Sequence, residues 1–273
     1  MRFPIILAAV VALARPVAAQ VQIHHAALRV TVIPEARTDV FVGVLKANPH
    51  MRITVQKMGG QIILDGGLGV RNASCAGRLG QRGVRIAGLG FVPYDDLPQV
   101  IVRTPLDAKV SAGGAVFGVV GRSNALDLSQ AGCGDWTVAD VVGSAKFRSS
   151  GSGDIRAGSI GSASVRISGS ADVFMQTVHG GLDAATAGSG DVRAERIDGP
   201  LHVRVAGSGD VIAPAGRVSE MKVAIAGSGD VRFGGVADSL EAAVLGSGDV
   251  VVHRVLGRVV KRTAGSGAIR IGG

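Results

Sequence analysis

Aromatic residues are scarce in this sequence of 273 residues: one Trp, one Tyr and seven Phe make up 3% of the chain. A hydrophobic core must therefore consist mainly of aliphatic side chains, which the 47% of hydrophobic residues supply. Proteins that bind nucleic acid cluster basic residues with aromatic side chains that stack on bases. The sequence contains no such cluster, so we expect no nucleic-acid partner.

Several catalytic motifs are also absent. The sequence has no G-x-S-x-G, no H-E-x-x-H, and no Gly-Lys pair from which a phosphate-binding loop of the Walker type could be built. Its six histidines share no common spacing. No long segment has the 3.6-residue periodicity of an amphipathic helix, which argues against a helical fold.

The only two cysteines are Cys75 and Cys133, and no C-x-x-C motif occurs. Redox catalysis and a zinc site of the C-x-x-C type are therefore unsupported. In an exported protein two cysteines can form one disulfide. We expect a bridge between Cys75 and Cys133, with two unpaired thiols as the alternative.

The first nineteen residues differ from the rest of the chain. Arg2 is followed by an apolar stretch from Phe3 to Ala14, and Val17-Ala18-Ala19 places small residues before Gln20. This pattern is typical of a secretory signal peptide, residues 1–19, with cleavage before Gln20. No later hydrophobic run is long enough to cross a bilayer. We therefore expect an exported protein, periplasmic or at the cell surface and extracellular, with no transmembrane segment in the mature chain.

A short motif returns at a nearly constant interval through the C-terminal half. Successive copies are 18 to 20 residues apart, which is the signature of a repeat architecture. The copies are GCGD at Gly132, GSAD at Gly169, GSGD at Gly151, Gly188, Gly207, Gly227 and Gly246, and GSGA at Gly265.

Within each copy, the fourth and sixth residues after the first glycine are apolar, and the residue between them varies. This alternation indicates a half-buried strand, and a second alternating strand precedes the next glycine, as in Leu201, Val203 and Val205. A unit this short must stack on its neighbours to bury its apolar face. The sequence predicts an all-β fold, a right-handed parallel β-helix or β-solenoid with coils of about 19 residues.

The repeats occupy residues 107–273. Residues 20–106 lack the tight repeat but contain strand-like segments, so we interpret them as an N-terminal β-rich capping region continuous with the solenoid. We expect the glycine-rich segment from Gly66 to Gly90 to form a long loop. The repeat glycines have two expected roles: a positive φ at a sharp corner, and room for successive backbones to approach.

The aspartates that follow the repeat glycines would form a column with carboxylates about 5 Å apart, which repel one another by about 1–3 kcal/mol. Backbone amides at the corner can offset this repulsion, and Arg156, Arg193 and Arg232, two residues further on, can pair with the column. We therefore predict no metal and no cofactor. Calcium between coils is the alternative, since oxygen ligands suit that ion. Its ligands would be Asp154, Asp191, Asp210, Asp230 and Asp249.

The reiterated Gly-Ser-Gly-Asp-Val, the VRTP segment at 102–105 and the signal peptide resemble a bacterial family labelled "putative auto-transporter adhesin, head GIN domain". The resemblance covers residues 30–271. It implies a right-handed parallel β-helix-like fold and a periplasmic or surface location. It carries over no catalytic residue.

We interpret the chain as a non-enzymatic exported solenoid that presents a long face to an envelope protein or a glycan. One alternative is a polysaccharide-acting enzyme on the same fold, for which Asp191 beside Arg193 would supply acid–base groups. The other alternative is a calcium-stabilised structural module.

Overall fold

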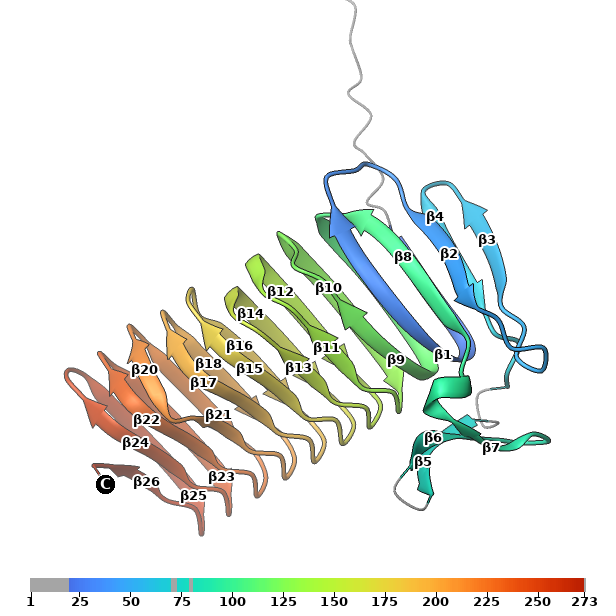
Figure 1. The fold of residues 1–273 in the computed structure, drawn as a ribbon. Helices are drawn as coiled ribbons and strands as arrows, with labels where there is room; N and C mark the ends of the chain where they lie inside the picture. Colours follow the sequence, from blue (N-terminus) through green and yellow to red (C-terminus); the bar gives the residue numbers. More distant parts are fainter. Residues whose placement is uncertain (1–19, 70–72, 79–80, 273) are drawn as a thin grey trace, which may run out of the picture.

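The computed structural model describes residues 20–69, 73–78 and 81–272. It is a parallel β-solenoid of about nine turns with coils of about 19 residues, drawn out as a rod in Figure 1. The fold class expected from the repeat is confirmed. The expected signal peptide, residues 1–19, lies outside the described residues.

Each coil contributes strands to two parallel sheets that meet at the Gly-x-Gly-Asp segment, here called the glycine corner. The upstream sheet precedes the corner and the downstream sheet follows it. In stacking order the upstream sheet contains β4 (Gln61–Asp65), the first parts of β1 (Gln20–Glu35) and β9 (Asp107–Val120), β10 (Ala125–Gly132), β12 (Val141–Ser149), β14 (Ile160–Ile167), β16 (Leu182–Thr186), β18 (Leu201–Val205), β21 (Met221–Ile225), β23 (Leu240–Gly246) and β25 (Val259–Gly265).

The downstream sheet has the same stacking order. It contains β8 (Gln99–Pro105), the last parts of β1 and β9, β11 (Trp136–Val138), β13 (Ile155–Ala157), β15 (Val173–Val178), β17 (Val192–Asp198), β19 (Val211–Ala213) with β20 (Ala215–Val218), β22 (Val231–Ala237), β24 (Val250–Val255) and β26 (Ile269–Ile271).

Equivalent residues of successive coils lie in register. Val192 pairs with Val211 and Val211 with Val231, and all three side chains are buried. The inward positions expected from the alternation are buried from Trp136 to Val252. In the last coil they are exposed in β25 and half-buried in β26. The ring of Trp136 occupies the place that a side chain at Gly118 would need in the preceding coil. Apolar burial between coils therefore holds the stack together.

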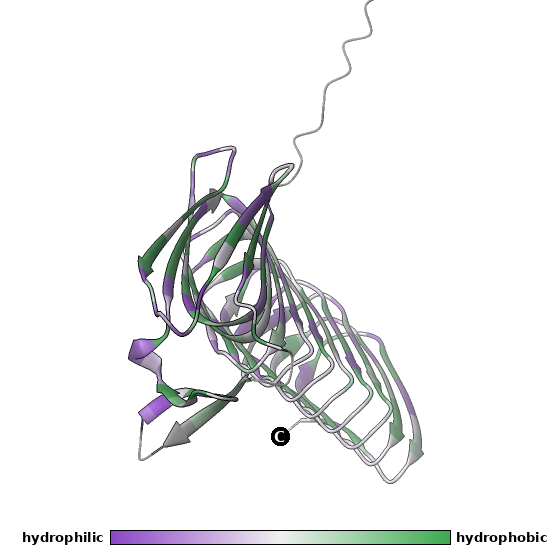
Figure 2. Cartoon of the chain, turned by 90° about the vertical axis from the view of Figure 1, so that its right-hand side faces the viewer, coloured by the Kyte–Doolittle hydropathy of each residue, from purple (hydrophilic) through white to green (hydrophobic). Residues whose placement is uncertain are grey.

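The repeat glycines allow successive backbones to approach closely. A Cβ on Gly188 would lie 2.0 Å from the Gly169 carbonyl oxygen, and one on Gly207 would lie 2.2 Å from that of Gly188. The expectation of a positive φ is wrong for most copies, because among the first glycines of the copies only Gly246 and Gly265 have one. Crowding therefore explains the glycines, and the pale corner loops lie directly against one another along one edge in Figure 2.

The N-terminal end extends the same stack out of chain order. β1 lies between β8 and β9 in the downstream sheet, and between β4 and β9 in the upstream sheet. Two antiparallel strands complete this end: β2 (Phe41–Lys46) pairs with β8, and β3 (Thr54–Met58) pairs with β4. They occupy the backbone edges that a further coil would otherwise use.

The prediction of a long loop between Gly66 and Gly90 is wrong. A separate antiparallel sheet forms there from β5 (Ala73–Arg78), β6 (Gln81–Ile86) and β7 (Gly90–Pro93), followed by the 3-10 turn η1 (Tyr94–Asp96). Val84 and Ile86 of β6 and Leu97, which follows η1, form a small second core with residues on the outer surface of β1 and β9.

Several contacts fasten this three-stranded sheet to the solenoid. A disulfide joins Cys75 in β5 to Cys133 in the first glycine corner. Arg82 pairs with Asp135 at 2.5 Å. The Tyr94 ring meets Phe117 edge-on at 5.1 Å, and the Arg29 guanidinium lies 4.3 Å from the Tyr94 ring centre. Tyr94 and the disulfide between Cys75 and Cys133 thus both attach the three-stranded sheet to the solenoid.

At the C-terminal end, Lys261 occupies an inward position, opposite Ala242 of the preceding coil. Its Nζ donates a hydrogen bond to the Ile269 carbonyl oxygen at 3.1 Å. The lysine thus joins the two strands of the last described coil, where the inner face is exposed.

Substituting Gly207→Ala should destabilise the fold by about 1–3 kcal/mol, because the new methyl group has no space between two stacked backbones. Thermal or urea unfolding measures the change. Ser208→Ala, an exposed neighbour, is the matched control and should stay close to wild type. Equal stability of the two variants would contradict the crowding explanation.

Replacing both cysteines, Cys75→Ser with Cys133→Ser, should loosen the three-stranded sheet while the solenoid keeps its structure. Loss of a native disulfide costs about 2–4 kcal/mol, and here the loss is confined to a sheet whose core is small. Hydrogen exchange at residues 81–93 should accelerate, whereas exchange in β16 to β23 should not change. Unchanged protection of β6 and β7 would refute this role of the bridge.

Candidate functional site

The aspartates of the glycine corners form a column along one edge of the solenoid. The Oδ1 of each aspartate accepts a hydrogen bond from the backbone N–H at the equivalent position of the next coil. The seven bonds run from Asp154, Asp172, Asp191, Asp210, Asp230, Asp249 and Ala268 to the carboxylates of Asp135, Asp154, Asp172, Asp191, Asp210, Asp230 and Asp249, at 2.7 to 3.1 Å. The amide capping expected for this aspartate column is present at every step.

Arginines of the downstream sheet supply a second compensation. Arg156 pairs with Asp154 at 3.4 Å, and Arg232 pairs with Asp230 at 2.5 Å. The expected pairing of Arg193 with Asp191 is wrong, because the Arg193 guanidinium turns to Glu195 on its own strand at 3.3 Å. At the end of the column, the Ala268 N–H and then Arg270 lower the pKa of Asp249.

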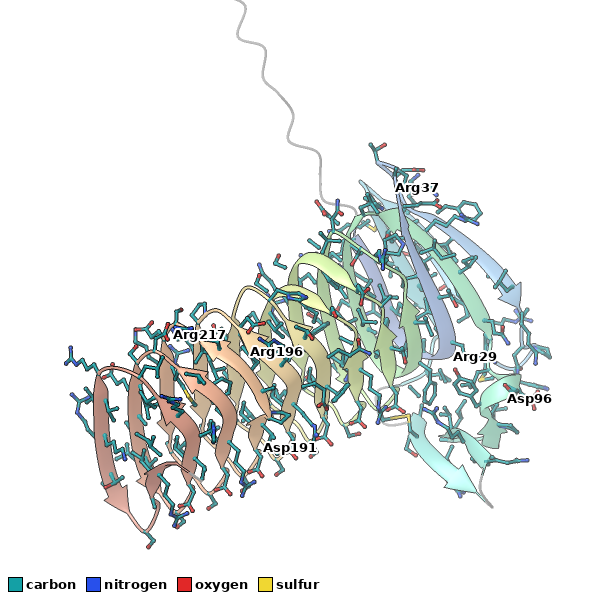
Figure 3. All side chains as sticks on the ribbon, turned by 60° about the vertical axis from the view of Figure 1, so that its left-hand side comes forward. Arg29, Arg37, Asp96, Asp191, Arg196 and Arg217 are labelled. Atoms are coloured by element: carbon teal, nitrogen blue, oxygen red, sulfur yellow. A yellow bond between two sulfur atoms is a disulfide. The ribbon has the colours of Figure 1, made fainter. Side chains whose placement is uncertain are left out.

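Along the opposite edge of the solenoid, some aspartates also accept a hydrogen bond from a backbone N–H of the next coil, but not in every coil. The Ser159 N–H and then Arg122 lower the pKa of Asp140. The guanidinium of Arg196 and then the Arg217 N–H lower that of Asp198. Figure 3 shows Asp191 on one long edge and Arg196 and Arg217 on the other. Both edges therefore use carboxylates to join successive coils.

The five aspartates considered for calcium, Asp154, Asp191, Asp210, Asp230 and Asp249, all lie in the aspartate column. Within residues 20–69, 73–78 and 81–272, no group of three or more His, Cys, Asp or Glu side chains is placed to hold a metal ion. The hydrogen bonds that these carboxylates accept come from the backbone amides of the next coil.

A groove of about 520 Å³ crosses the outer surface of the upstream sheet, beside the glycine corners. It extends from Ser111 in β9 to Arg204 and Ala206 at β18. Six coils contribute to it, so its length is about 24 Å at the spacing of parallel strands. We call it the arginine groove.

The floor and one wall of the arginine groove come from two columns of equivalent residues. The floor consists of small side chains just before each corner, among them Ser150, Ser168, Ala187 and Ala206. The wall consists of outward residues two positions earlier. Arg148, Arg166 and Arg204 stand there, with Ala185 between the last two.

Carboxylates on the outer rim hold the three arginines. Arg148 pairs with Asp127 at 2.5 Å, and Asp183 accepts from both Arg166 at 2.8 Å and Arg204 at 3.4 Å. Between about two fifths and two thirds of each arginine side chain is still exposed. The guanidinium groups are thus oriented by the protein and accessible from the groove.

Charge is divided unequally between the two sheets. The upstream strands from β10 to β25 contain seven Lys or Arg residues and three Asp or Glu residues. The downstream strands from β11 to β26, together with the aspartate column, contain seven arginines and nine acidic residues. The face that carries the arginine groove is therefore the cationic one.

Inward residues and corners alone do not predict this groove, although the sequence contains its signal. The residue three positions before the first glycine is Ser, Arg, Arg, Ala, Arg, Ala, Ala and Arg in successive copies. The residue one position before it is small in every copy except Leu245. These two periodic positions would have predicted a cationic wall above a shallow floor.

Fold and groove together define the class of protein: an elongated parallel β-solenoid with a cationic groove along one face. Residues 179–273 match the model of the family described as "Putative auto-transporter adhesin, head GIN domain". No curated protein matches the chain.

A solved structure described as a "putative adhesin from Parabacteroides distasonis" is similar to this chain with a TM-score of 0.51. At 15% sequence identity the match covers 93% of this chain and 92% of the other, and it shows a shared fold. Within the described ranges, no helix is both long enough and apolar enough to cross a membrane.

The stabilisation contributed by Asp249 should depend on pH. Because its folded pKa lies below the unfolded value of about 3.9, the carboxylate stabilises the fold above that pH. The contribution is lost as the pH falls through the folded pKa. The difference in melting temperature between wild type and Asp249→Asn should therefore be largest near neutral pH and should shrink in acid.

Ser247→Ala, an exposed neighbour in the same corner, is the control for this titration. Its difference from wild type should not change with pH. A constant difference for Asp249→Asn across the acid range would show that its carboxylate charge does not support the last coils.

Proposed function

We propose that this protein is an exported, non-enzymatic, adhesin-like binding module that acts at the cell envelope. In this proposal an extended ligand lies along the arginine groove. The groove is the observation that carries the proposal, because it runs across six coils and is open to solvent. The family match of residues 179–273 supports an adhesin-like role, and the N-terminal signal-peptide pattern supports export.

The construction of the groove suits an extended ligand. Its floor and its arginine wall belong to strands held in register by backbone hydrogen bonds and by the buried core. Such a surface is ordered before binding, so little conformational entropy is lost when a ligand docks. A ligand that repeats along its length can meet the same kind of contact in each coil.

The contacts favour binding over polysaccharide cleavage. Glycoside hydrolysis generally needs two carboxyl groups that flank the scissile bond. The pair that had suggested an acid–base site does not form, since Arg193 bonds Glu195 and not Asp191. Asp127 and Asp183, on the rim of the groove, are engaged by its arginines.

Filling the groove tests the proposal. Ala187→Trp places a large side chain on the floor without changing the charge, and Ser208→Trp places the same side chain on an exposed corner outside the groove. We expect the labelled mature chain to co-sediment with bacterial cell envelopes. Ala187→Trp should lower the affinity at least tenfold, and Ser208→Trp should leave it within about twofold.

Circular dichroism and thermal unfolding establish that both tryptophan variants are folded. Equal binding by the two variants would show that the ligand binds outside the groove. If the wild-type chain did not co-sediment with envelopes, the proposed binding role would be contradicted.

A further inference from the structure

We infer that the ligand of the arginine groove is a linear acidic polysaccharide, a chain of sugars that carry carboxylate or sulfate groups. This inference rests on the proposed function and names its ligand class. It assigns the anionic groups of the polymer to Arg148, Arg166 and Arg204, and the sugar rings to the floor of small residues.

The spacing of the arginines is that of a polymer. Arg148 lies opposite Arg166 in the next coil, Arg166 opposite Ala185, and Ala185 opposite Arg204. Their backbones are therefore separated by one coil and by two, or about 5 Å and about 10 Å along the axis. Sugars in an extended chain advance by a similar distance, so a polymer with one anion per sugar presents its charges at this interval.

The guanidinium groups already show how they bind a carboxylate. Arg166 directs its Nη2 to Asp183, while its Nη1 donates to the carbonyl oxygens of Val165 and Asp183. The hydrogen bonds of Arg148 and Arg204 to the rim carboxylates each use a single Nη1. Since a guanidinium has five N–H donors, each of these two retains donors for a second anion.

The distribution of counter-charges leaves the wall cationic. Asp183 serves both Arg166 and Arg204, so two rim carboxylates face three guanidinium groups. Lys146 adds positive charge on the same outer face, whereas the charge of Lys222 is balanced by Glu220 at 2.6 Å. A polyanion that lies in the groove supplies the missing negative charge.

The floor provides polar and apolar contacts that suit sugar rings. The Ser150 and Ser168 hydroxyls point toward backbone carbonyls at 3.5 Å, so their oxygens can accept from sugar hydroxyls. Further along, Ala187 and Ala206 offer methyl groups to the C–H faces of the rings. A floor of such small side chains lets a flat chain approach the backbone closely.

Other polyanions fit this surface less well. Single-stranded nucleic acid binds through bases stacked on aromatic side chains, and the lining of the groove contains no aromatic residue. An anionic membrane presents a flat plane of charge, whereas these arginines line a groove. Binding to an anionic membrane is therefore an outcome of the test.

The experiment measures binding of the mature chain to polygalacturonate, heparin, dextran and phosphatidylserine vesicles. The groove variant is Arg148→Gln, Arg166→Gln and Arg204→Gln combined. The matched control is Arg156→Gln, Arg193→Gln and Arg232→Gln combined, which removes the same charge from the downstream sheet. Melting temperatures establish that both triple variants are folded.

We expect wild type to bind polygalacturonate or heparin, with affinity that falls as salt is added, and not to bind dextran. Polygalacturonate carries carboxylates only, whereas heparin carries sulfates as well, so binding to heparin alone would show that sulfate is required. The groove variant should lose at least a hundredfold in affinity, since one charged hydrogen bond corresponds to about tenfold or more. The control should stay within about threefold of wild type.

Equal losses in the two triple variants, equal binding of dextran, or binding to vesicles alone would overturn the inference. Suppose that Ala187→Trp abolishes envelope binding while the groove variant keeps it. The groove then binds a ligand that is not anionic, and the proposed function stands without this ligand class. If neither change affects envelope binding, the proposed function falls as well.

Discussion

The close approach of successive backbones at the glycine corner is the constraint on which this structure depends. A single added Cβ at Gly188 would lie 2.0 Å from the carbonyl oxygen below it, so the coils stack only where no side chain intervenes. This contact fixes the register of each coil on the next. The aspartate column follows from it, because each carboxylate then lies beside the amide of the next coil, as Asp210 Oδ1 does beside the Asp230 N–H at 2.7 Å.

The same register determines the outer surface. Residues at the same distance from the corner in successive coils form a column on the surface. The charge and size of that column depend on how often one residue type recurs at that position. The positions just before the corner are small and form a floor, while Arg148 and Arg166 rise beside it as a wall. The upstream face gains its positive charge in this way, and the acidic corners leave the other side of the molecule with the opposite sign.

The period of the sequence was sufficient to predict the stacking of the coils, although not the backbone conformation of the repeat glycines. Coil length, inward residues such as Val211 and Phe233, and the amide capping of the aspartates all follow from one period. The three-stranded sheet was missed because Ala73–Arg78 pairs with Gln81–Ile86 only once, without a periodic signal. Arg193 was assigned to Asp191 by spacing, but Glu195 on its own strand is also within its reach. The arginine groove was overlooked because arginine fills only some copies of its position, a pattern that a solvated surface also gives.

A stack in which each coil touches only its two neighbours has a consequence for how such a protein can evolve. Duplication of one nineteen-residue unit adds a coil without disturbing any existing contact, as the tolerance of 18-, 19- and 20-residue steps already suggests. If the added coil carries arginine on its wall, the valency of the groove rises by one. Avidity for a long polymer can therefore change in discrete increments, while the fold and the chemistry of each contact stay the same.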